Sequence, residues 1–129
     1  MDKYKLLNGV TLAYMGDAVY ELRIREYLIN QGYTKVNELH KLAIKYVSAT
    51  TQAKVIYEWE KTKFLTDEEY SIVRRGRNAK INHGRLNVDV LTYKHSTSFE
   101  ALIGYLYLIN ESRRLQEIIQ EAIRMIESW

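Results

Sequence analysis

Two acidic residues stand next to segments that a folded chain would be expected to bury. Asp17 follows Gly16 inside a predicted helix, a position where glycine costs about 1 kcal/mol relative to alanine. Glu100 directly precedes Ala101–Ile109, the most apolar segment of the chain. A carboxylate near a core is costly unless it is paired, hydrogen-bonded or bound to a metal ion. Either each acid has a local partner, or both serve one site.

Spacing alone also offers a structural explanation for each acid. Thr97 and Glu100 fit the S/T-x-x-E capping box, in which the glutamate closes back on the first turn of its own helix. Asp17 fits the second turn of its helix, where the helix macrodipole favours an anion. Glu21 is a candidate third ligand, but Arg25 at i+4 offers it an ordinary surface ion pair, which we favour. The residues by themselves leave these alternatives open.

A basic segment lies between the two acids. From Arg74 to His95 there are six arginines and lysines against a single acid, although the whole chain carries a formal charge of only +3. Such a local cluster indicates a surface for a polyanion, with a solvated charged face as the alternative. The residues that we expect to contact phosphates are Arg74, Arg75, Arg77, Lys80, Arg85 and Lys94.

Other chemistries find little support in the sequence. There is no cysteine, which excludes disulfides, thiolate metal sites and a cysteine nucleophile. His40, His83 and His95 lack the spacing of a zinc site, and no glycine-rich nucleotide-binding loop is present. No run approaches the roughly 18 apolar residues of a membrane span, and no apolar leader opens the chain. We therefore expect a soluble cytoplasmic protein.

The elements that must position these residues are helices. The chain has no proline and only six glycines in 129 residues, and its apolar residues recur at helical spacing. Ser48, and Thr66 with Glu69, supply helix start signals. We predict six helices, near residues 11–29, 36–47, 49–62, 67–79, 98–110 and 112–127.

The helix predicted near residues 98–110 is apolar on almost every side, so we expect it to be the buried central helix. Gly104 would admit the close approach of a neighbour. Residues 80–94 lack a clean period, and we expect them to form a long loop. The length suits a single domain. The sequence thus predicts one compact all-α domain over residues 1–129, with about six or seven helices.

Two segments resemble the signatures of the ribonuclease III family. The segment LAYMGDAV at 12–19 is similar to a helix that carries a metal-binding aspartate, here Asp17. The segment SFEALIGYLYL at 98–108 is similar to the second signature, whose glutamate is an essential metal ligand, here Glu100. Their order, with the basic segment between them, supports the resemblance, which covers essentially the whole chain. The short length resembles the Mini-ribonuclease III subfamily, which lacks a double-stranded-RNA-binding domain.

The resemblance implies a magnesium-dependent endonuclease that cuts double-stranded RNA. Asp17 and Glu100 would be its catalytic residues and its metal ligands, with Mn²⁺ as a substitute for Mg²⁺. Products would carry 5′-phosphate and 3′-hydroxyl ends. The resemblance also implies a homodimer and a role in the maturation of precursor 23S ribosomal RNA. Two carboxylates are adequate for Mg²⁺, which keeps several waters and takes one or two protein carboxylates.

The chain departs from the larger members of the family at two positions. Those enzymes carry further acids at the positions of Ala13 and Thr97 in this sequence. The site here therefore has fewer acidic residues, as the resemblance to Mini-ribonuclease III implies. One alternative is a non-catalytic double-stranded-RNA-binding structural protein of the same fold, against which Asp17 and Glu100 argue. Another is a helical protein-interaction module with an acidic partner, which salt-sensitive RNA binding would exclude.

Overall fold

The structure is a computed structural model that describes residues 3–79 and 89–129, and the regular elements of these residues are all helical, as predicted. In chain order they are η1 (Lys3–Leu6), α1 (Gly9–Asn30), α2 (Val36–Val47), α3 (Ala49–Thr62), α4 (Asp67–Arg77), α5 (Val90–Leu108) and α6 (Ser112–Glu127). Within the described part of the chain, no helix combines the length and apolar character that crossing a membrane requires.

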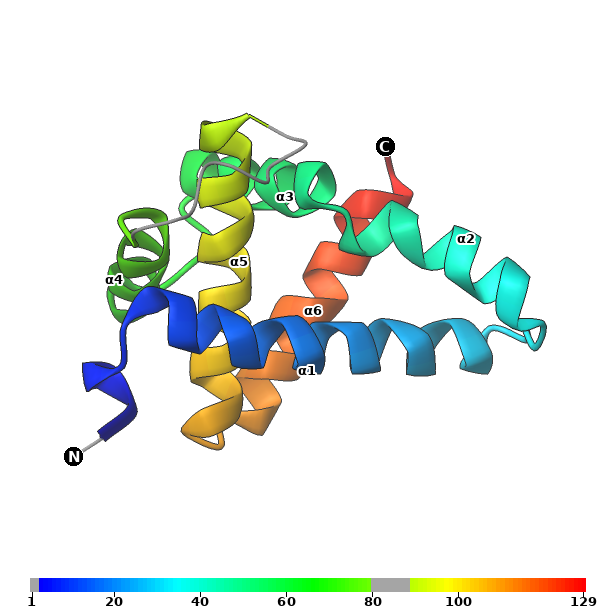
Figure 1. Cartoon of the computed structure of the whole chain (residues 1–129), viewed down its shortest axis with the longest axis horizontal. Coiled ribbons are helices and arrows are strands. Elements are labelled where there is room, and N and C mark those ends of the chain that lie inside the picture. The colour runs from blue at the N-terminus through cyan, green and yellow to red at the C-terminus, as the bar shows by residue number, and fades with distance from the viewer. Residues whose placement is uncertain (1–2, 80–88) are drawn as a thin grey trace.

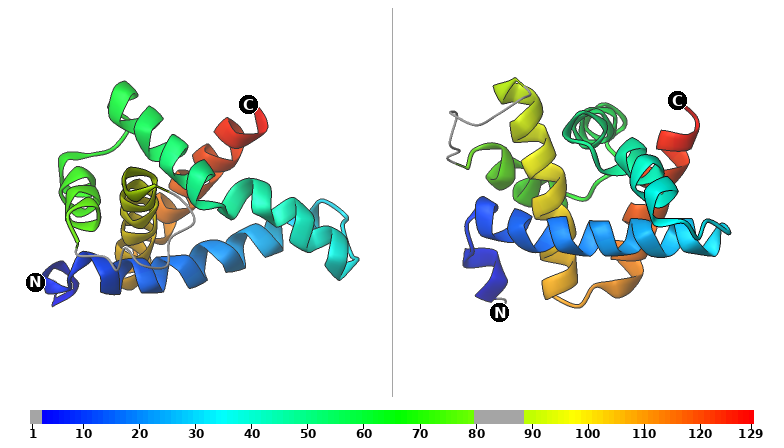
Figure 2. Two further views of the ribbon diagram at one scale, coloured as in Figure 1. Left: turned by 45° about the horizontal axis from the view of Figure 1, so that its top comes forward. Right: turned by 45° about the vertical axis from the view of Figure 1, so that its right-hand side comes forward.

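Helix α5 is the centre of the fold, as the sequence predicted. It is surrounded by α1, α3, α4 and α6, while α2 lies beside the C-terminal half of α1 (Figure 1, Figure 2). Phe99 is fully buried, with its ring edge-on to Tyr20 of α1 at 4.8 Å and stacked on Trp59 of α3 at 5.9 Å. These ring contacts hold three helices together next to the partly buried Glu100 and so fix the position of its backbone.

Helix α5 begins earlier than the sequence predicted. Asp89 caps it by accepting a hydrogen bond from the Thr92 N–H at 2.8 Å, so the expected loop is wrong from Val90 onward, and residues 80–88 lie outside the described part. The Thr97 hydroxyl donates to the Tyr93 carbonyl at 2.9 Å in the helix interior. The capping-box explanation of Glu100 is therefore wrong. The first half of α5 lacks an apolar period because its buried residues Ser96, Thr97 and Ser98 are polar, and two of them, Thr97 and Ser98, bond to carbonyls of their own helix.

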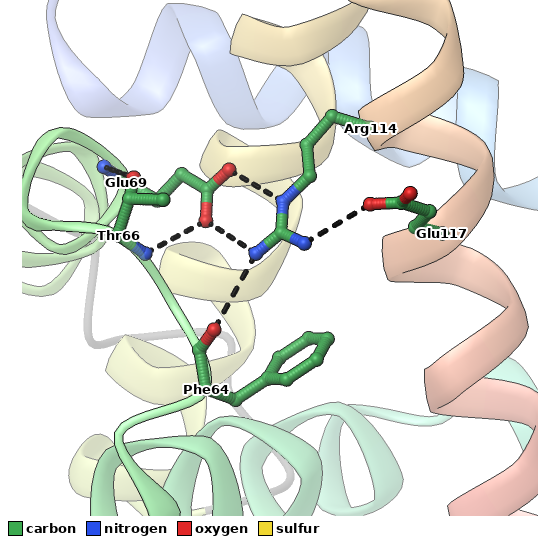
Figure 3. Close-up of polar contacts among 5 residues, drawn as sticks. All are labelled: Phe64, Thr66, Glu69, Arg114 and Glu117. Carbon is green, nitrogen blue, oxygen red and sulfur yellow. Dashed lines mark hydrogen bonds and ion pairs between the residues drawn. The ribbon is translucent and has the colours of Figure 1, made fainter.

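The predicted capping box at the start of α4 is confirmed, and it extends to α6 (Figure 3). The Glu69 carboxylate accepts from the Thr66 N–H at 3.0 Å and from two nitrogens of Arg114 at 2.8 and 2.9 Å. Arg114 also pairs with Glu117 at 3.2 Å and lies over the Phe64 ring. Burial alone would raise the pKa of Glu69, but the hydrogen bonds from Arg114 and Thr66 hold it below its usual value. Ionised Glu69 thus ties α4 to α6.

Replacing Glu69 by glutamine should lower the free energy of unfolding at pH 7 by about 2 kcal/mol, because Arg114 would lose its buried charged partner. The pKa of Glu69 is lower in the folded chain than its usual 4.5, so this stability is present above about pH 4.5 and is lost as the pH falls through the folded pKa. Urea unfolding at pH 7 and pH 3 should show the gap between the two proteins narrowing in acid.

Glu117→Gln is the matched control for this prediction. Glu117 pairs with the same arginine but its side chain is half exposed, so its loss should change the free energy of unfolding by less than about 0.5 kcal/mol. A Glu69→Gln protein as stable as the wild type at pH 7 would contradict the role given to this ion pair.

Candidate active site

The candidate site forms where α1 crosses α5, at two glycines (Figure 1). A Cβ atom on Gly16 would lie 1.7 Å from the backbone oxygen of Glu100, and one on Gly104 would lie 2.0 Å from that of Leu12. The two backbones therefore touch, and the close approach that we expected at Gly104 is confirmed. Because Asp17 follows Gly16 and Glu100 lies opposite it, this crossing makes the two acids neighbours.

The two acids share one electrostatic environment. Burial raises the pKa of Glu100 to about 8, and the negative charge of Asp17 and a hydrogen bond with it add to this shift. Glu21 contributes a smaller charge effect in the same direction. Asp17 itself is exposed. A second carboxylate beside an ionised one is stabilised by taking up a proton or by a bound cation. The site therefore offers a cation a partly buried oxygen ligand, from Glu100, and an exposed one, from Asp17.

The residues present fit a hard divalent ion. In residues 3–79 and 89–129, no cluster of three or more histidine, cysteine, aspartate or glutamate side chains is placed to hold a metal. The two carboxylates that the helix crossing brings together are Asp17 and Glu100. Magnesium usually takes one or two protein carboxylates and completes its octahedron with waters and substrate phosphate oxygens. A cation there would also offset the charge repulsion that raises the pKa of Glu100.

The other acid considered as a ligand has a different partner. Glu21 accepts a hydrogen bond from the Arg25 Nε at 3.3 Å across one helical turn, as predicted. Ala13 and Thr97, the two positions at which the larger enzymes described above carry further acids, supply no carboxylate here. Ala13 is buried, and the Thr97 hydroxyl bonds within its own helix. As the sequence indicated, neither position adds a carboxylate to Asp17 and Glu100.

Two arginines of the basic segment bond within the chain. Arg75 donates to the carbonyls of Lys5 and Leu7, the latter at 3.1 Å, and so fastens η1 to the end of α4. Arg77 forms an ion pair with Glu60 of α3. Neither role was predicted from the sequence. Both arginines are only partly exposed, which leaves their predicted contact with RNA phosphates as a prediction.

The remaining members of the predicted RNA-binding set differ in their placement. Arg74 is exposed near the end of α4, and Lys94 is partly exposed on the first half of α5. Lys80 and Arg85 lie outside the described residues. Among the four members that the structure describes, Arg74 is exposed and the other three are partly exposed. Arg74 is therefore the best probe of an RNA surface.

Sequence reasoning missed two buried polar residues beside the acids. Gln52 of α3 is 2% exposed and makes a hydrogen bond with Glu100. The hydroxyl of Ser96 donates to the Gln52 Oε1 at 2.7 Å. A signal was available, because Gln52 shares the buried face of its helix with Val55 and Trp59. A glutamine on such a face calls for a polar partner in the core.

The chain matches known proteins along nearly its whole length. The family profile described as the Ribonuclease III domain matches residues 10–111. A Mini-ribonuclease 3 from Enterococcus faecalis is 47% identical over 126 residues, covering 98% of this chain and 96% of the relative. One from Symbiobacterium thermophilum is 48% identical over 121 residues, covering 94% and 92%. The chain therefore belongs to the ribonuclease III family, and within it to the Mini-ribonuclease 3 group.

The fold is also similar to a solved one. A crystal structure of a protein from Fusobacterium nucleatum superposes with a TM-score of 0.83 at 30% sequence identity, covering 96% of this chain and 98% of the other. The similarity extends over the arrangement of all the helices rather than one motif. The all-α fold predicted from the sequence is thus shared with a known protein.

Proposed function

We propose that this chain is a divalent-metal-dependent endoribonuclease that cuts double-stranded RNA, with Asp17 and Glu100 as its metal ligands and catalytic residues. One observation carries the proposal: the glycine crossing of α1 and α5 places these two acids side by side, with Glu100 buried enough for its pKa to rise to about 8. Membership of the ribonuclease III family and relatives named Mini-ribonuclease 3 support it. The proposed ion is Mg²⁺, with Mn²⁺ as a substitute.

Asp17 and Glu100 would hold a divalent ion, which would supply an activated water and offset charge on the scissile phosphate. The chain contributes the placement of its two ligands. Glu100 is fixed by the packing of Phe99, while Asp17 is exposed and accessible to a phosphate from outside. Hydrolysis would leave 5′-phosphate and 3′-hydroxyl ends. The proposed substrate is precursor 23S ribosomal RNA.

Replacing either acid by its amide tests the site directly. Asp17→Asn and Glu100→Gln remove an anionic ligand while nearly keeping the shape, so cleavage of a long RNA duplex in Mg²⁺ should fall by orders of magnitude. Glu26→Gln, at an exposed acid elsewhere on α1, should keep near-native activity. Circular dichroism should show helix content unchanged in all three. Near-native cleavage by both site variants would refute the proposed site, and a wild type that binds duplex but never cuts it would favour a structural RNA-binding role.

The exposed arginine of the basic segment tests the RNA surface. Contacts with phosphates release counterions, so binding weakens steeply with salt, and each lost contact should reduce the slope of log K against log salt by about 1. Arg74→Gln should therefore flatten the slope for an RNA duplex measured without Mg²⁺. Arg113→Gln, at an exposed arginine of α6 outside the basic segment, should leave it unchanged. Equal slopes for the wild type and Arg74→Gln would place the RNA surface elsewhere.

We further propose that the enzyme is a symmetric homodimer. One pair of acids serves one strand, so cutting both strands of a duplex calls for two sites facing opposite backbones, which a two-fold axis supplies. The apolar residues of α5 from Phe99 to Leu106 are buried within the chain. Helix α1 keeps an apolar outer stripe, since Val10, Tyr14 and Leu22 are 47%, 81% and 57% exposed. This stripe is the proposed dimer surface.

Sedimentation equilibrium at micromolar protein should give about twice the chain mass of 15.3 kDa, and duplex products should end in short staggered 3′ overhangs. Tyr14→Lys should move the mass toward that of one chain, because it places a charge in the proposed interface. Tyr57→Lys is the matched control, an exposed tyrosine on α3. A monomeric wild type that still made paired staggered cuts would refute the dimer.

A further inference from the structure

A buried glutamine connects the core of α3 to the proposed metal site. Gln52 is 2% exposed, and the Ser96 side chain bonded to it is also buried, at 7% exposure for the residue. Polar groups in such a place are retained only when their hydrogen bonds are made. Every contact of this carboxamide therefore matters for what the side chain can do.

The contacts decide which way the carboxamide points. The Val47 carbonyl can only accept a hydrogen bond, so the Gln52 nitrogen faces it, at 3.3 Å. The carboxamide oxygen accepts from the Ser96 hydroxyl at 2.7 Å. The nitrogen has a second hydrogen, and Glu100 lies one helical turn after Ser96 on the same face of α5, which brings the glutamate next to the carboxamide. A donor in that position stabilises the ionised carboxylate, in agreement with the hydrogen bond from Gln52 that lowers the pKa of Glu100 against the effect of burial.

We propose that Gln52 is a positioning residue for the metal site, whose amide nitrogen donates to the Glu100 carboxylate and fixes its direction toward Asp17. The inference rests on the proposed role of Glu100 as a metal ligand. The carboxamide oxygen is held by the Ser96 hydroxyl, and the other hydrogen of its nitrogen is held by the Val47 carbonyl. The whole arrangement joins α3 to α5, so the ligand direction is set by the packing of two helices.

Because the proposed site has only two carboxylates, the positioning of Glu100 matters for metal binding. Thr97, at the position of an acid in larger enzymes, bonds to its own helix. Two carboxylates must then hold the ion, and a glutamate with three rotatable bonds loses entropy when it is ordered as a ligand. A fixed donor reduces this loss on binding. Partners of metal ligands typically contribute 10- to 100-fold in metal affinity or activity.

Two hydroxyls on α5 provide a matched pair of variants. Ser96 and Ser98 are both buried and lie two residues apart, but the Ser98 hydroxyl donates to the Lys94 carbonyl of its own helix at 3.1 Å. Ser96→Ala removes a contact of Gln52, whereas Ser98→Ala removes a comparable buried hydroxyl that does not touch it. Gln52→Met, close in length and without a donor, removes the contact with Glu100 itself.

Mn²⁺ binding to the full chain without RNA can be measured by the loss of the free-ion electron paramagnetic resonance signal. The affinity for Mn²⁺ should fall by about 10-fold or more in Gln52→Met. Ser96→Ala should weaken it by about 3-fold or more, and Ser98→Ala by less than 2-fold. In duplex cleavage the first two variants should lower kcat and leave KM for RNA unchanged, because the RNA surface is intact.

The outcomes separate this inference from the function on which it rests. If Glu100→Gln binds Mn²⁺ as well as the wild type, the metal site is wrong and the role of Gln52 falls with it. If Glu100→Gln loses binding while Ser96→Ala binds like Ser98→Ala, the metal site stands and the role of Gln52 is overturned. The serine pair decides the matter even if Gln52→Met fails to fold.

Discussion

Helices α1 and α5 meet backbone to backbone at Gly16 and Gly104, and the rest of the structure depends on that contact. A Cβ on either residue would reach within 2.0 Å of a carbonyl oxygen of the other helix. No side chain can be accommodated between the backbones at this distance, so the crossing point is fixed in register as well as in direction. Asp17 follows one of the glycines and Glu100 lies opposite it. The position of the acid pair is thus a consequence of two missing side chains.

The same crossing accounts for the position of a partly buried acid next to the core. Glu100 is preceded by Phe99, which packs against Tyr20 and Trp59, and its pKa rises to about 8 through burial and the charge of Asp17. A group in that state is poorly stabilised as a lone carboxylate. In the proposed site, a cation shared with Asp17 would relieve the repulsion, and a donor such as Gln52 would stabilise the ionised form. Stability and the proposed chemistry therefore make opposite demands on this residue, as is common at functional sites.

Outside the crossing, polar contacts fix how the surrounding helices dock. Ionised Glu69 accepts from Arg114 and from the backbone of Thr66, which joins α4 to α6 (Figure 3). At the other end of the fold, the Glu127 carboxylate accepts hydrogen bonds from the hydroxyls of Tyr27 and Tyr46 at 2.5 and 2.7 Å. These contacts hold α6 against α1 and α2. They keep the shell around α5 in place, and with it the partners of Glu100.

The sequence by itself predicted the helices, apart from the start of α5, and singled out Asp17 and Glu100 as candidate metal ligands, a role that stays a prediction. Periodicity and start signals such as Ser48 and Thr66 depend on residues close together in the chain, and the structure confirms both caps. The predicted start of α5 was wrong because Ser96, Thr97 and Ser98 are buried through hydrogen bonds rather than apolar contacts, which leaves no apolar period to detect. Only the tertiary structure decided that Glu100 faces Asp17 and Gln52, that Glu69 meets Arg114, and that Arg75 holds η1. Those contacts join residues far apart in sequence, and their partners follow from how helices cross rather than from local spacing.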